Sequence, residues 1–449
     1  MTETRPYDLL IIGGGISGAA LLYCAARFSS LKRIALVEKY SSIAAVNSSA
    51  RNNSQTLHCG DIETNYTLDK ALKVKHAAGM VTRYAEDAPD RHQFFFQYPK
   101  MVLAVGDVEV NKLHARYEQF AAHYPGMRWL NKHDIAAVEP RVVDHNGSPR
   151  QEELGACATL NEYCAVDYRA LAQSFVDNAQ RQKKELAVHL DCKVAGIEHK
   201  DGMFSVPTSQ GILSARAVVV SAGGHSLLFA QRMGYGLNFS VLPVAGSFYY
   251  TPKVLNGKVY TMQNDKLPFA AVHGDPDVLE VGKTRFGPTA IILPMLERYA
   301  PSTIGDFLRV VRIDGHVVKV LAGLFGDAEI RRYMLKNMLF EIPILRRHLF
   351  LKDAQKIVPS LRLSDLRFAR HTGGIRPQLI DKIKDQLLLG EAKIDSGKGI
   401  IFNMTPSPGA TSCLANAEKD LAVMASFLGE KFYQDQFTAE LVEPASIQT

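Results

Sequence analysis

The 449-residue sequence is poor in cysteine and has a single tryptophan. Its six cysteines form no C-x-x-C pair, which disfavours a structural zinc site or a disulfide framework and favours reduced, mostly buried thiols. No stretch approaches the roughly 18 uncharged apolar residues that a membrane-spanning helix needs. The first apolar run has only about six residues before a glycine turn, too few for a signal-peptide core. We therefore expect a cytoplasmic protein.

The charge balance is nearly even, with 52 basic and 46 acidic side chains and a net charge of +6. A mild basic excess suits an anionic substrate, a phosphate-bearing cofactor or an acidic membrane surface. No dense Lys/Arg run with interleaved aromatic residues occurs, so we expect no nucleic-acid partner. Histidines and carboxylates do not cluster at the spacing of metal ligands, so we expect no metal site.

A β-α-β pattern opens the chain. Residues 7–12 are continuously apolar, as is typical of a parallel strand that is covered on both faces, and they are followed by a helix over 19–28 and a strand over 33–38. Farther along, the pattern predicts a helix over 168–182, short strands over 186–190, 193–197 and 215–221, and mainly strands between 230 and 325.

The turn after the first strand has the spacing Gly13-x-Gly15-x-x-Gly18, and Glu38 ends the second strand. Gly13 permits the tight turn, Gly15 lets the backbone approach a pyrophosphate, and Gly18 lets the helix pack closely on the strand. The helix N-terminus offers free N–H groups and a positive dipole end to phosphates. Glu38 would accept hydrogen bonds from ribose hydroxyls, which argues against a 2′-phosphate. The pattern predicts a dinucleotide site.

Three further segments resemble the D-amino-acid-oxidase-like branch of the FAD-dependent oxidoreductases: the polar run 48–58, the strand and turn 217–224, and the loop 399–411. In that branch they run beneath FAD, form a second flavin-side strand, and lead into a helix that points at the flavin. The resemblance implies FAD as the cofactor. Besides Gly13, Gly15, Gly18 and Glu38, the cofactor contacts that we predict are Ser17, Lys39, Asn52, Ser54, Gln55, Val194, Ala222, Gly223, Gly374, Arg376, Gly409, Ala410 and Thr411.

Within that branch the chain is similar to the malate:quinone oxidoreductases, especially the shorter bacterial form, through residues 65–67, 285–290, 373–378 and 407–410. The resemblance runs from Tyr7 to about residue 428 and departs from the longer form around His58. It implies oxidation of (S)-malate, or a similar small hydroxy acid, to oxaloacetate in the tricarboxylic acid cycle. It also implies a membrane quinone as electron acceptor and a peripheral position on the inner face of the cytoplasmic membrane.

Nucleotide-fold signatures recur at the start, near 190–224 and near 399–412. We therefore predict an α/β protein with a discontinuous Rossmann-like FAD-binding domain and an inserted α+β substrate domain with a mixed sheet. The predicted ranges are 1–75, 150–225 and 365–435 for the FAD domain, 76–149 and 226–364 for the substrate domain, and 436–449 for a C-terminal tail.

Arginines are the candidates for binding the substrate carboxylates, since their planar fork matches a carboxylate. Arg376 is the best, because the glycines before it allow close approach to a ligand, and it is also a candidate catalytic residue. Arg285 precedes a Gly-Pro that passes the flavin in similar enzymes. Arg51 lies in the polar run and could as easily contact the pyrophosphate.

Histidine is the natural base for the hydroxyl proton, since its pKa lies near working pH. His273 is chosen by a small margin, because related hydroxy-acid dehydrogenases carry a histidine on the strand that faces the substrate. His371, five residues before Arg376, is the second candidate. His58 could contact the substrate or hydrogen-bond the flavin, with covalent attachment a minor alternative, and Tyr163 is a candidate for the pocket lining.

The segment 330–352 combines apolar residues at helical spacing with six basic side chains. Such a segment can lie in a membrane interface, where a quinone is found. A helix that packs on its own sheet is at least as consistent with the pattern, and both readings stay open.

Three alternative functions remain. A 2-hydroxyglutarate dehydrogenase or oxidase of the same branch needs a pocket longer by one methylene. An amine or amino-acid oxidase needs a carboxylate placed to meet an ammonium group. A flavin-binding protein that modifies RNA or acts as a structural module would show no substrate-dependent bleaching of the flavin.

Overall fold

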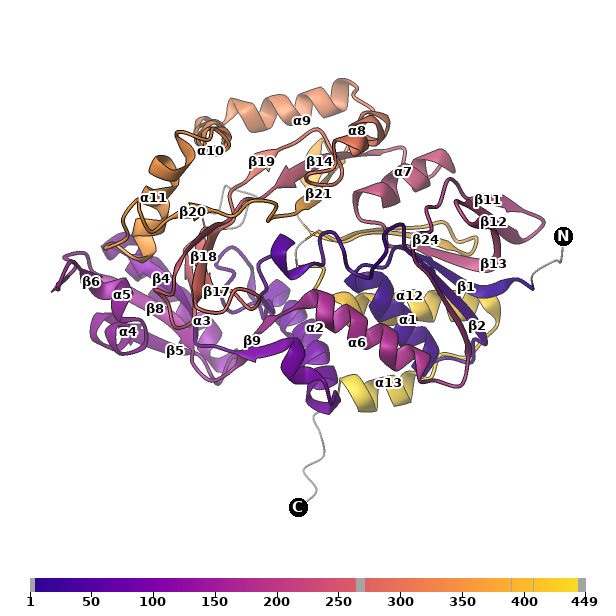
Figure 1. Cartoon of the computed structure of the whole chain (residues 1–449), viewed down its shortest axis with the longest axis horizontal. Helices are drawn as coiled ribbons and strands as arrows, with labels where there is room; N and C mark the ends of the chain where they lie inside the picture. Colours follow the sequence, from indigo (N-terminus) through magenta and orange to yellow (C-terminus); the bar gives the residue numbers. More distant parts are fainter. Residues whose placement is uncertain (1–4, 264–270, 389, 407, 443–449) are drawn as a thin grey trace, which may run out of the picture.

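The computed structural model describes residues 5–263, 271–388, 390–406 and 408–442. A first large sheet occupies the right half of Figure 1 and a second one the left half, with a row of helices across the top. The mixed α/β class that the sequence predicts is confirmed.

The first sheet contains the predicted β-α-β unit. Strands β10, β2, β1, β13 and β24 run parallel in that order, and β11, β12 and β23 add antiparallel pairs. One edge of β13 pairs with β12 through its first half and with β24 through its last residues. The bounds are β1 Tyr7–Ile12, β2 Arg33–Val37, β10 Glu185–His189, β11 Glu198–Lys200, β12 Met203–Thr208, β13 Gly211–Val220, β23 Ala392–Asp395 and β24 Ile400–Met404.

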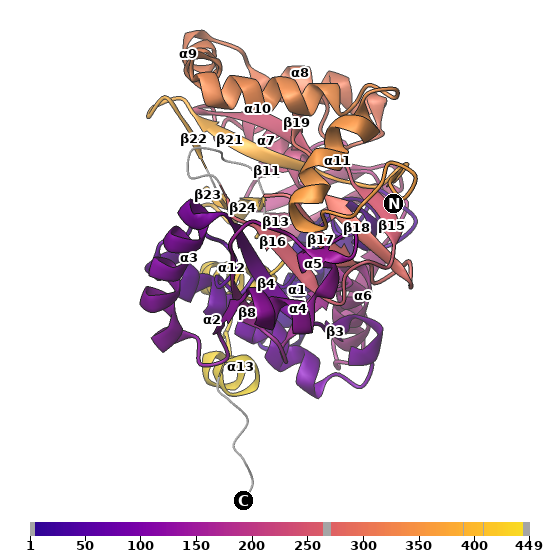
Figure 2. The same cartoon turned by 90° about the vertical axis from the view of Figure 1, so that its left-hand side faces the viewer.

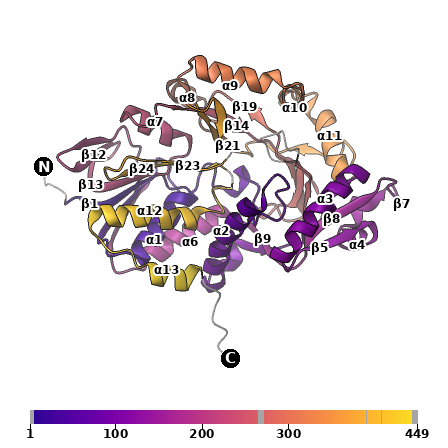
Figure 3. The same cartoon turned by 180° about the vertical axis from the view of Figure 1, so that it is seen from behind.

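Alternate residues of the central strands enter two different cores. Leu9 and Ile11 pack against helices α1 (Ile16–Arg27), α6 (Tyr168–Gln180) and α12 (Cys413–Leu428). Leu10 and Ile12 pack on the opposite face, toward β12 and α7 (Gly224–Arg232). This burial on both faces explains why the strand is continuously apolar. Helices α2 (Leu68–Asp87) and α13 (Gln434–Leu441) form an outer layer beside α12 (Figure 3).

The second sheet is mixed, because β4 and β16 are parallel while its other neighbours are antiparallel. Its order is β20-β15-β18-β17-β16-β4-β8-β5, with α3 on one face and α4, α5 and α11 on the other. The bounds are β4 Lys100–Val105, β5 Arg128–Asn131, β8 Leu154–Thr159, β15 Tyr249–Pro252, β16 Lys258–Thr261, β17 His273–Pro276, β18 Lys283–Gly287, β20 Arg367–Phe368, α3 Asp107–Phe120, α4 Lys132–Val138, α5 Pro140–Val143 and α11 Arg346–Ile357.

A third sheet, in the order β19-β14-β21-β22, lies beneath the helices at the top of Figure 1. Leu242 and Val244 of β14 pack under helix α9, whereas Val241 faces the first sheet. The bounds are β14 Phe239–Ala245, β19 Ile291–Ile292, β21 Ile375–Asp381, β22 Gln386–Leu388, α8 Ile304–Val311, α9 Gly315–Gly326 and α10 Ala328–Leu339. The remaining elements are the pairs β3 Phe95–Gln97 with β9 Tyr163–Val166 and β6 Asp144–His145 with β7 Ser148–Pro149, and the 3-10 turns Ala50–Asn52, Arg91–Gln93, Ala121–His123 and Pro301–Thr303.

The prediction of strands between 230 and 325 is wrong for its last part, where α8 and α9 form. Helix α9 contains several β-branched residues, yet Asp314 caps it by accepting hydrogen bonds from the backbone N–H groups of His316 and Val317, both at 3.1 Å. Val317 and Val320 pack into the core under α9. The cap and the packing outweigh β propensity here.

The strand predicted over 193–197 is also wrong. Only Val194 forms an isolated bridge, to Thr208. Asp191 has a positive φ of 52°, which turns the chain away from the sheet edge just before this segment.

The division into domains stays a prediction, and two features of the structure bear on its limits. The boundary between 75 and 76 falls inside α2, whose buried residues Ala77 and Val81 join the core around α1. The predicted tail begins inside α13, where Phe437 is fully buried, so its described part is a packed helix.

Candidate active site

A cavity of about 650 Å³ lies where the carboxyl ends of β1, β2 and β13 approach strands β14 and β21. The chain enters β1 from the right in Figure 1, so this edge of the sheet faces the middle of the molecule. Ligands of open α/β sheets bind outside the carboxyl ends of the strands, and the volume is typical of a cofactor site.

The glycine turn leaves the wall of this cavity without side chains. Gly13 has a φ of +112°, and a Cβ there would overlap the carbonyl oxygen of Ser221. A Cβ at Gly18 would overlap the carbonyl oxygen of Gly13, so α1 packs directly on the turn. A Cβ at Gly15 would meet only Ser48 Oγ, at 3.3 Å, because Gly15 borders the cavity. A pyrophosphate fits this opening at the N-terminus of α1.

Glu38 follows β2 and lines the same cavity. Its carboxylate accepts hydrogen bonds from the backbone N–H groups of Gly14 at 2.7 Å and Tyr40 at 3.0 Å, which orient it beside the glycine turn. Burial raises the pKa of Glu38, against these hydrogen bonds. This position suits the predicted contact with ribose hydroxyls.

The sequence reasoning missed a charged cluster at the Glu38 end of the cavity. Glu297 forms an ion pair with Lys39 at 2.6 Å and accepts a hydrogen bond from the Tyr40 hydroxyl at 2.5 Å. The two ring nitrogens of His225 lie 3.7 Å from Glu297 and 3.4 Å from Asp306. Both Glu297 and Asp306 lie far from Lys39 in the chain, and no local pattern links them.

Most of the predicted cofactor contacts line the cavity. They are Gly13, Gly15, Ser17, Glu38, Lys39, Asn52, Ser54, Val194, Ala222, Gly223, Gly374, Arg376, Gly409 and Ala410. Gly18, Gln55 and Thr411 lie behind this lining. The amide of Gln55 donates to the carbonyl of Ala50 and accepts from the backbone of Val278, so it supports the polar run rather than facing the cavity.

The polar run is tied to β21 by amide side chains. Asn47 donates to the carbonyl of Ile375 at 2.9 Å and accepts from its N–H at 3.1 Å. The N–H of Gly373 donates to the side chain of Asn52 at 3.2 Å. A Cβ at Gly374 would lie 2.6 Å from the carbonyl oxygen of Asn52, so this close approach requires glycine. These contacts fix the start of β21, where Arg376 follows.

Arg376 lines the cavity, is partly buried, and has no hydrogen-bond or ion-pair partner among the described residues. Burial lowers its pKa, while the nearby hydroxyls of Tyr333, Tyr66 and Tyr260 raise it. The three tyrosines come from α10, the loop before α2, and β16, so the sequence reasoning did not bring them together. An unpaired guanidinium with phenol groups around it is suited to bind a carboxylate.

Arg285 and Arg51 lie elsewhere. Arg285 is fully buried, donates to the carbonyls of Ala50 and Asn53, and lies 3.5 Å from Asp277. It therefore joins β18 to the polar run, outside the cavity lining. Arg51 is exposed, and it too is absent from the lining among the described residues.

The favoured histidines do not face the cavity. His273 is 1% exposed, lies 3.1 Å from Asp275, and stacks on Tyr260, and burial lowers its pKa. His371 is exposed at a positive φ of 54° and meets the ring of Tyr299 edge-on.

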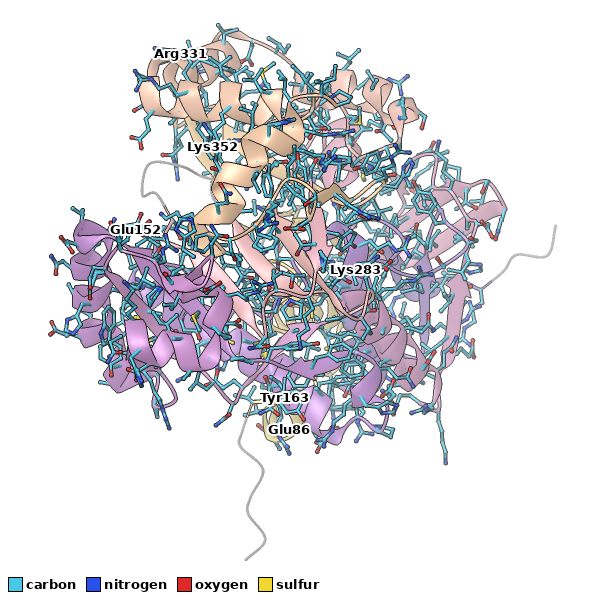
Figure 4. All side chains as sticks on the ribbon, turned by 60° about the vertical axis from the view of Figure 1, so that its left-hand side comes forward. Glu86, Glu152, Tyr163, Lys283, Arg331 and Lys352 are labelled. Atoms are coloured by element: carbon cyan, nitrogen blue, oxygen red, sulfur yellow. The ribbon has the colours of Figure 1, made fainter. Side chains whose placement is uncertain are left out.

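Tyr163 stacks on Phe95 at 39% exposure, and Figure 4 places it at the lower surface of the molecule. His58 does line the cavity, and its Nδ1 contacts Glu63. Of the predicted catalytic and substrate residues, the structure brings Arg376 and His58 to the cavity.

No group of three or more potential metal-ligating side chains is found in the described ranges. The fold and the glycine cradle define the class of this protein, an α/β dinucleotide-binding protein with an arginine at the wall of the cofactor cavity.

Comparisons with known proteins define the family. Residues 8–419 match the family described as FAD dependent oxidoreductase. The probable malate:quinone oxidoreductase of Campylobacter jejuni is 48% identical, with 98% of this chain and 99% of that protein covered. The malate:quinone oxidoreductase of Helicobacter pylori is 46% identical, with coverage of 97% and 98%. The mitochondrial L-2-hydroxyglutarate dehydrogenase of Bos taurus is 25% identical, with coverage of 92% and 87%.

Solved structures share the fold at low sequence identity. L-alpha-glycerophosphate oxidase from Mycoplasma pneumoniae, with FAD bound, has a TM-score of 0.64 at 17% identity, covering 94% of this chain and 95% of that one. Glycine oxidase from Geobacillus kaustophilus has a TM-score of 0.65 at 17% identity, covering 95% of both chains. The chain belongs to the FAD-dependent oxidoreductases and, within them, to the malate:quinone oxidoreductases. The family resemblance predicted from the sequence is confirmed.

Proposed function

We propose that this chain oxidises (S)-malate to oxaloacetate with FAD and passes the electrons to a membrane quinone, as a step of the tricarboxylic acid cycle. The observation that carries the proposal is Arg376, a guanidinium without a polar partner among the described residues at the wall of the cofactor cavity. The relatives named malate:quinone oxidoreductase, at 46% and 48% identity over nearly the whole chain, support the choice of substrate and acceptor.

The residues around the glycine turn fit FAD. Gly15 leaves room for the pyrophosphate, Glu38 faces the ribose position, and Gly409 and Ala410 line the cavity beside His58. When bound, FAD supplies the two-electron oxidant that accepts the hydride of the substrate. The chain contributes orientation and electrostatics.

Arg376 would bind a substrate carboxylate and thereby orient C2 toward the oxidant. Desolvation strengthens such a pair, because the partly buried guanidinium has no polar partner of its own among the described residues. Malate carries one carboxylate directly on C2 and the other one methylene away from C2. The distance between the groups that bind these two carboxylates therefore decides between malate and its longer homologue.

The acidic residues of the cavity favour a hydroxy acid over an amino acid. Among the described lining residues the carboxylates are Glu38, Glu297 and Asp306. Glu38 accepts two backbone hydrogen bonds, Glu297 contacts Lys39 and Tyr40, and Asp306 lies beside His225. All three belong to the Lys39 end, so none of them is placed beside Arg376 to receive an ammonium group.

A 2-hydroxyglutarate dehydrogenase is the second candidate, and the 25% identity to the Bos taurus enzyme is the observation that favours it. Anaerobic bleaching of the bound flavin separates the candidates. The flavin of the purified protein should be reduced by (S)-malate at a higher kcat/KM than by 2-hydroxyglutarate, and amino acids should leave it oxidised. Faster bleaching by 2-hydroxyglutarate or an amino acid would reassign the substrate.

Helices α8 to α11 support the proposed contact with the membrane. Ten of the 21 exposed large hydrophobic side chains among the described residues lie between 308 and 345. Residues 304–352 include nine basic and five acidic side chains. Figure 2 shows these helices together across the top of the molecule. Apolar insertion combined with basic charge favours an anionic lipid surface, and the proposed location is the inner face of the cytoplasmic membrane.

The segment 330–352, predicted as one amphipathic unit, is two helices. Helix α10 ends at Leu339 and α11 begins at Arg346, because the chain turns at 340–345. Met334 is buried, whereas Met338 is 55% exposed, so the apolar spacing is divided between the core and the surface. The packed-helix reading therefore describes the buried part of the segment, and the exposed part is the one that we propose to contact the membrane.

The basic residues of this segment divide in the same way. Arg346 lies over the ring of Phe368, 3.9 Å from its centroid, and Arg347 donates to the carbonyl of Leu363. Arg331 and Lys352 are exposed on the outer surface of α10 and α11, as Figure 4 shows. In the described part of the chain, no helix is both long and apolar enough to cross a bilayer. The exposed residues of α10 and α11 support docking of this surface on the membrane.

A further inference from the structure

His58 has a buried carboxylate on one side and the cavity on the other. Its Nδ1 forms a hydrogen bond with Oε1 of Glu63, and the two side chains are 16% and 6% exposed. Because an ionised carboxylate only accepts hydrogen bonds, a neutral imidazole in this position has its hydrogen on Nδ1 and its lone pair on Nε2. Nε2 lies 3.4 Å from Oγ of Ser54, which also lines the cavity.

The loop that brings Glu63 under His58 is firmly anchored. Gly60 has a φ of +81°, and a Cβ there would overlap the carbonyl oxygen of Ala71, so the reversal requires glycine. Asp61 forms a buried ion pair with Lys100 at 2.6 Å.

Contacts on either side of the pair hold its two ends. Arg116 donates to the carbonyl of Glu63 at 2.8 Å and to that of Tyr66 at 2.9 Å. The backbone N–H of His58 donates to Thr411 Oγ1 at 3.1 Å. The pair is therefore fixed between the loop 60–66 and Thr411.

The pair lies at the same end of the cavity as the proposed carboxylate site. His58 and Arg376 both line this cavity, and Asn47 and Asn52 of the polar run that leads to His58 hydrogen-bond to Ile375 and Gly373, just before Arg376. The other histidine of the lining, His225, lies at the Lys39 end, and each of its ring nitrogens faces a carboxylate. Among the described histidines of the lining, only His58 therefore has a ring nitrogen that is free of a carboxylate partner.

We propose that His58 is the catalytic base, with Glu63 as its positioning residue; this rests on the proposed function. The O–H bond of the substrate breaks and its proton passes to Nε2. The electron pair of that bond forms C2=O while the C2 hydrogen leaves with its two electrons to FAD, the oxidant named above. Glu63 holds the ring and stabilises the imidazolium that results.

The test compares H58Q, E63Q and E63D with H76Q, which replaces an exposed histidine on α2. The rate of anaerobic flavin reduction by malate should fall about 10²- to 10⁴-fold in H58Q, and its pH profile should lose the acid limb. E63Q should lower the rate at least about tenfold and move the acid limb to lower pH, with partial recovery in E63D. H76Q should match the wild type.

Binding supplies a second readout. Succinate, a dicarboxylate that cannot react, should perturb the flavin spectrum of H58Q with a Kd within a few-fold of the wild type, because Arg376 remains. Acid denaturation should release FAD completely from the wild type. Flavin that stays attached to the wild-type chain but not to H58Q would overturn the proposal, since Nε2 would then carry the cofactor.

The proposal would also be overturned if H58Q kept the acid limb and reduced its flavin at a near wild-type rate. It would likewise be overturned if H58Q lost succinate binding but kept the wild-type rate of flavin reduction at saturating malate. Failure of the proposed function looks different, because wild type and H76Q would then both fail to bleach with malate. If another hydroxy acid bleaches them, the same comparison is made with that substrate. If none does, the assignment of His58 falls with the proposed function.

Discussion

Two histidine–carboxylate pairs lie in different surroundings in this molecule. His58 and Glu63 border the cofactor cavity. His273 and Asp275 are sealed inside the second sheet, where Asp275 also lies 3.3 Å from the ammonium group of Lys258. The same side-chain types therefore serve different ends. An accessible ring nitrogen suits proton transfer, whereas a buried pair with a lysine serves the stability of the sheet.

The largest expected effect belongs to the sealed pair. Asp275→Asn leaves the buried ammonium of Lys258 without its carboxylate, which should lower the free energy of unfolding by about 3–5 kcal/mol. Urea unfolding measures this change. The exposed pair of Lys283 and Glu280 offers the control, since Glu280→Gln should cost less than about 1 kcal/mol. A D275N protein of normal stability that no longer reduces its flavin would reverse the roles of the two pairs.

Next in size is the loss of the carboxylate site. Arg376→Ala should lower kcat/KM for malate roughly a hundredfold or more, because a charged hydrogen-bond pair is removed. This corresponds to a loss of about 3 kcal/mol of transition-state stabilisation. KM should rise strongly while the urea midpoint changes little, since Arg376 has no polar partner among the described residues to leave unpaired. Arg376→Lys should restore part of the affinity but not the rate. Steady-state kinetics with a soluble acceptor would contradict this if KM were unchanged.

Acid should reduce the contribution of the sealed pair to the free energy of unfolding. The neighbouring His273 and Lys258 outweigh burial and lower the pKa of Asp275 to about 2. A lowered carboxyl pKa stabilises the fold above the unfolded value near 4, and this stabilisation is lost as pH falls through 2. The free energy of unfolding should therefore drop by about 2 kcal/mol between pH 4 and 2. Urea titrations at several pH values measure this drop. The free energy of unfolding of D275N should fall less between pH 4 and pH 2 than that of the wild type.

The smallest expected effect concerns the helices across the top. Lys352→Gln should weaken binding to anionic liposomes by about 1 kcal/mol, and added salt should weaken binding of the wild type. Leu335→Gln together with Met338→Gln should reduce co-sedimentation further, because both side chains are more than half exposed on α10. Val423→Gln, an exposed apolar position on α12, is the control. Binding unaffected by all of these changes would exclude this face as the docking surface.

The local part of the cofactor site was predictable from the sequence. Gly13, Gly15, Gly18 and Glu38 belong to one β-α-β unit, so their spacing along the chain already determines their arrangement in space. The strand predicted over 215–221 and the helices predicted over 19–28 and 168–182 likewise correspond to β13, α1 and α6. The prediction was wrong for α9, because the cap at Asp314 and packing on the third sheet outweigh the propensity of its β-branched residues.

The sequence by itself determined the nucleotide fold, the flavin cofactor class and the place of Arg376 at the cavity, since each depends on short contiguous motifs. Only the tertiary structure decided which histidine is accessible. His58 and His273 are both followed within five residues by a carboxylate, but one lies on a loop at the cavity and the other inside a sheet. Tyr66, Tyr260 and Tyr333 likewise act electrostatically on Arg376 from three distant elements. Exposure and long-range contacts depend on how separate elements pack together, and no local pattern encodes that packing.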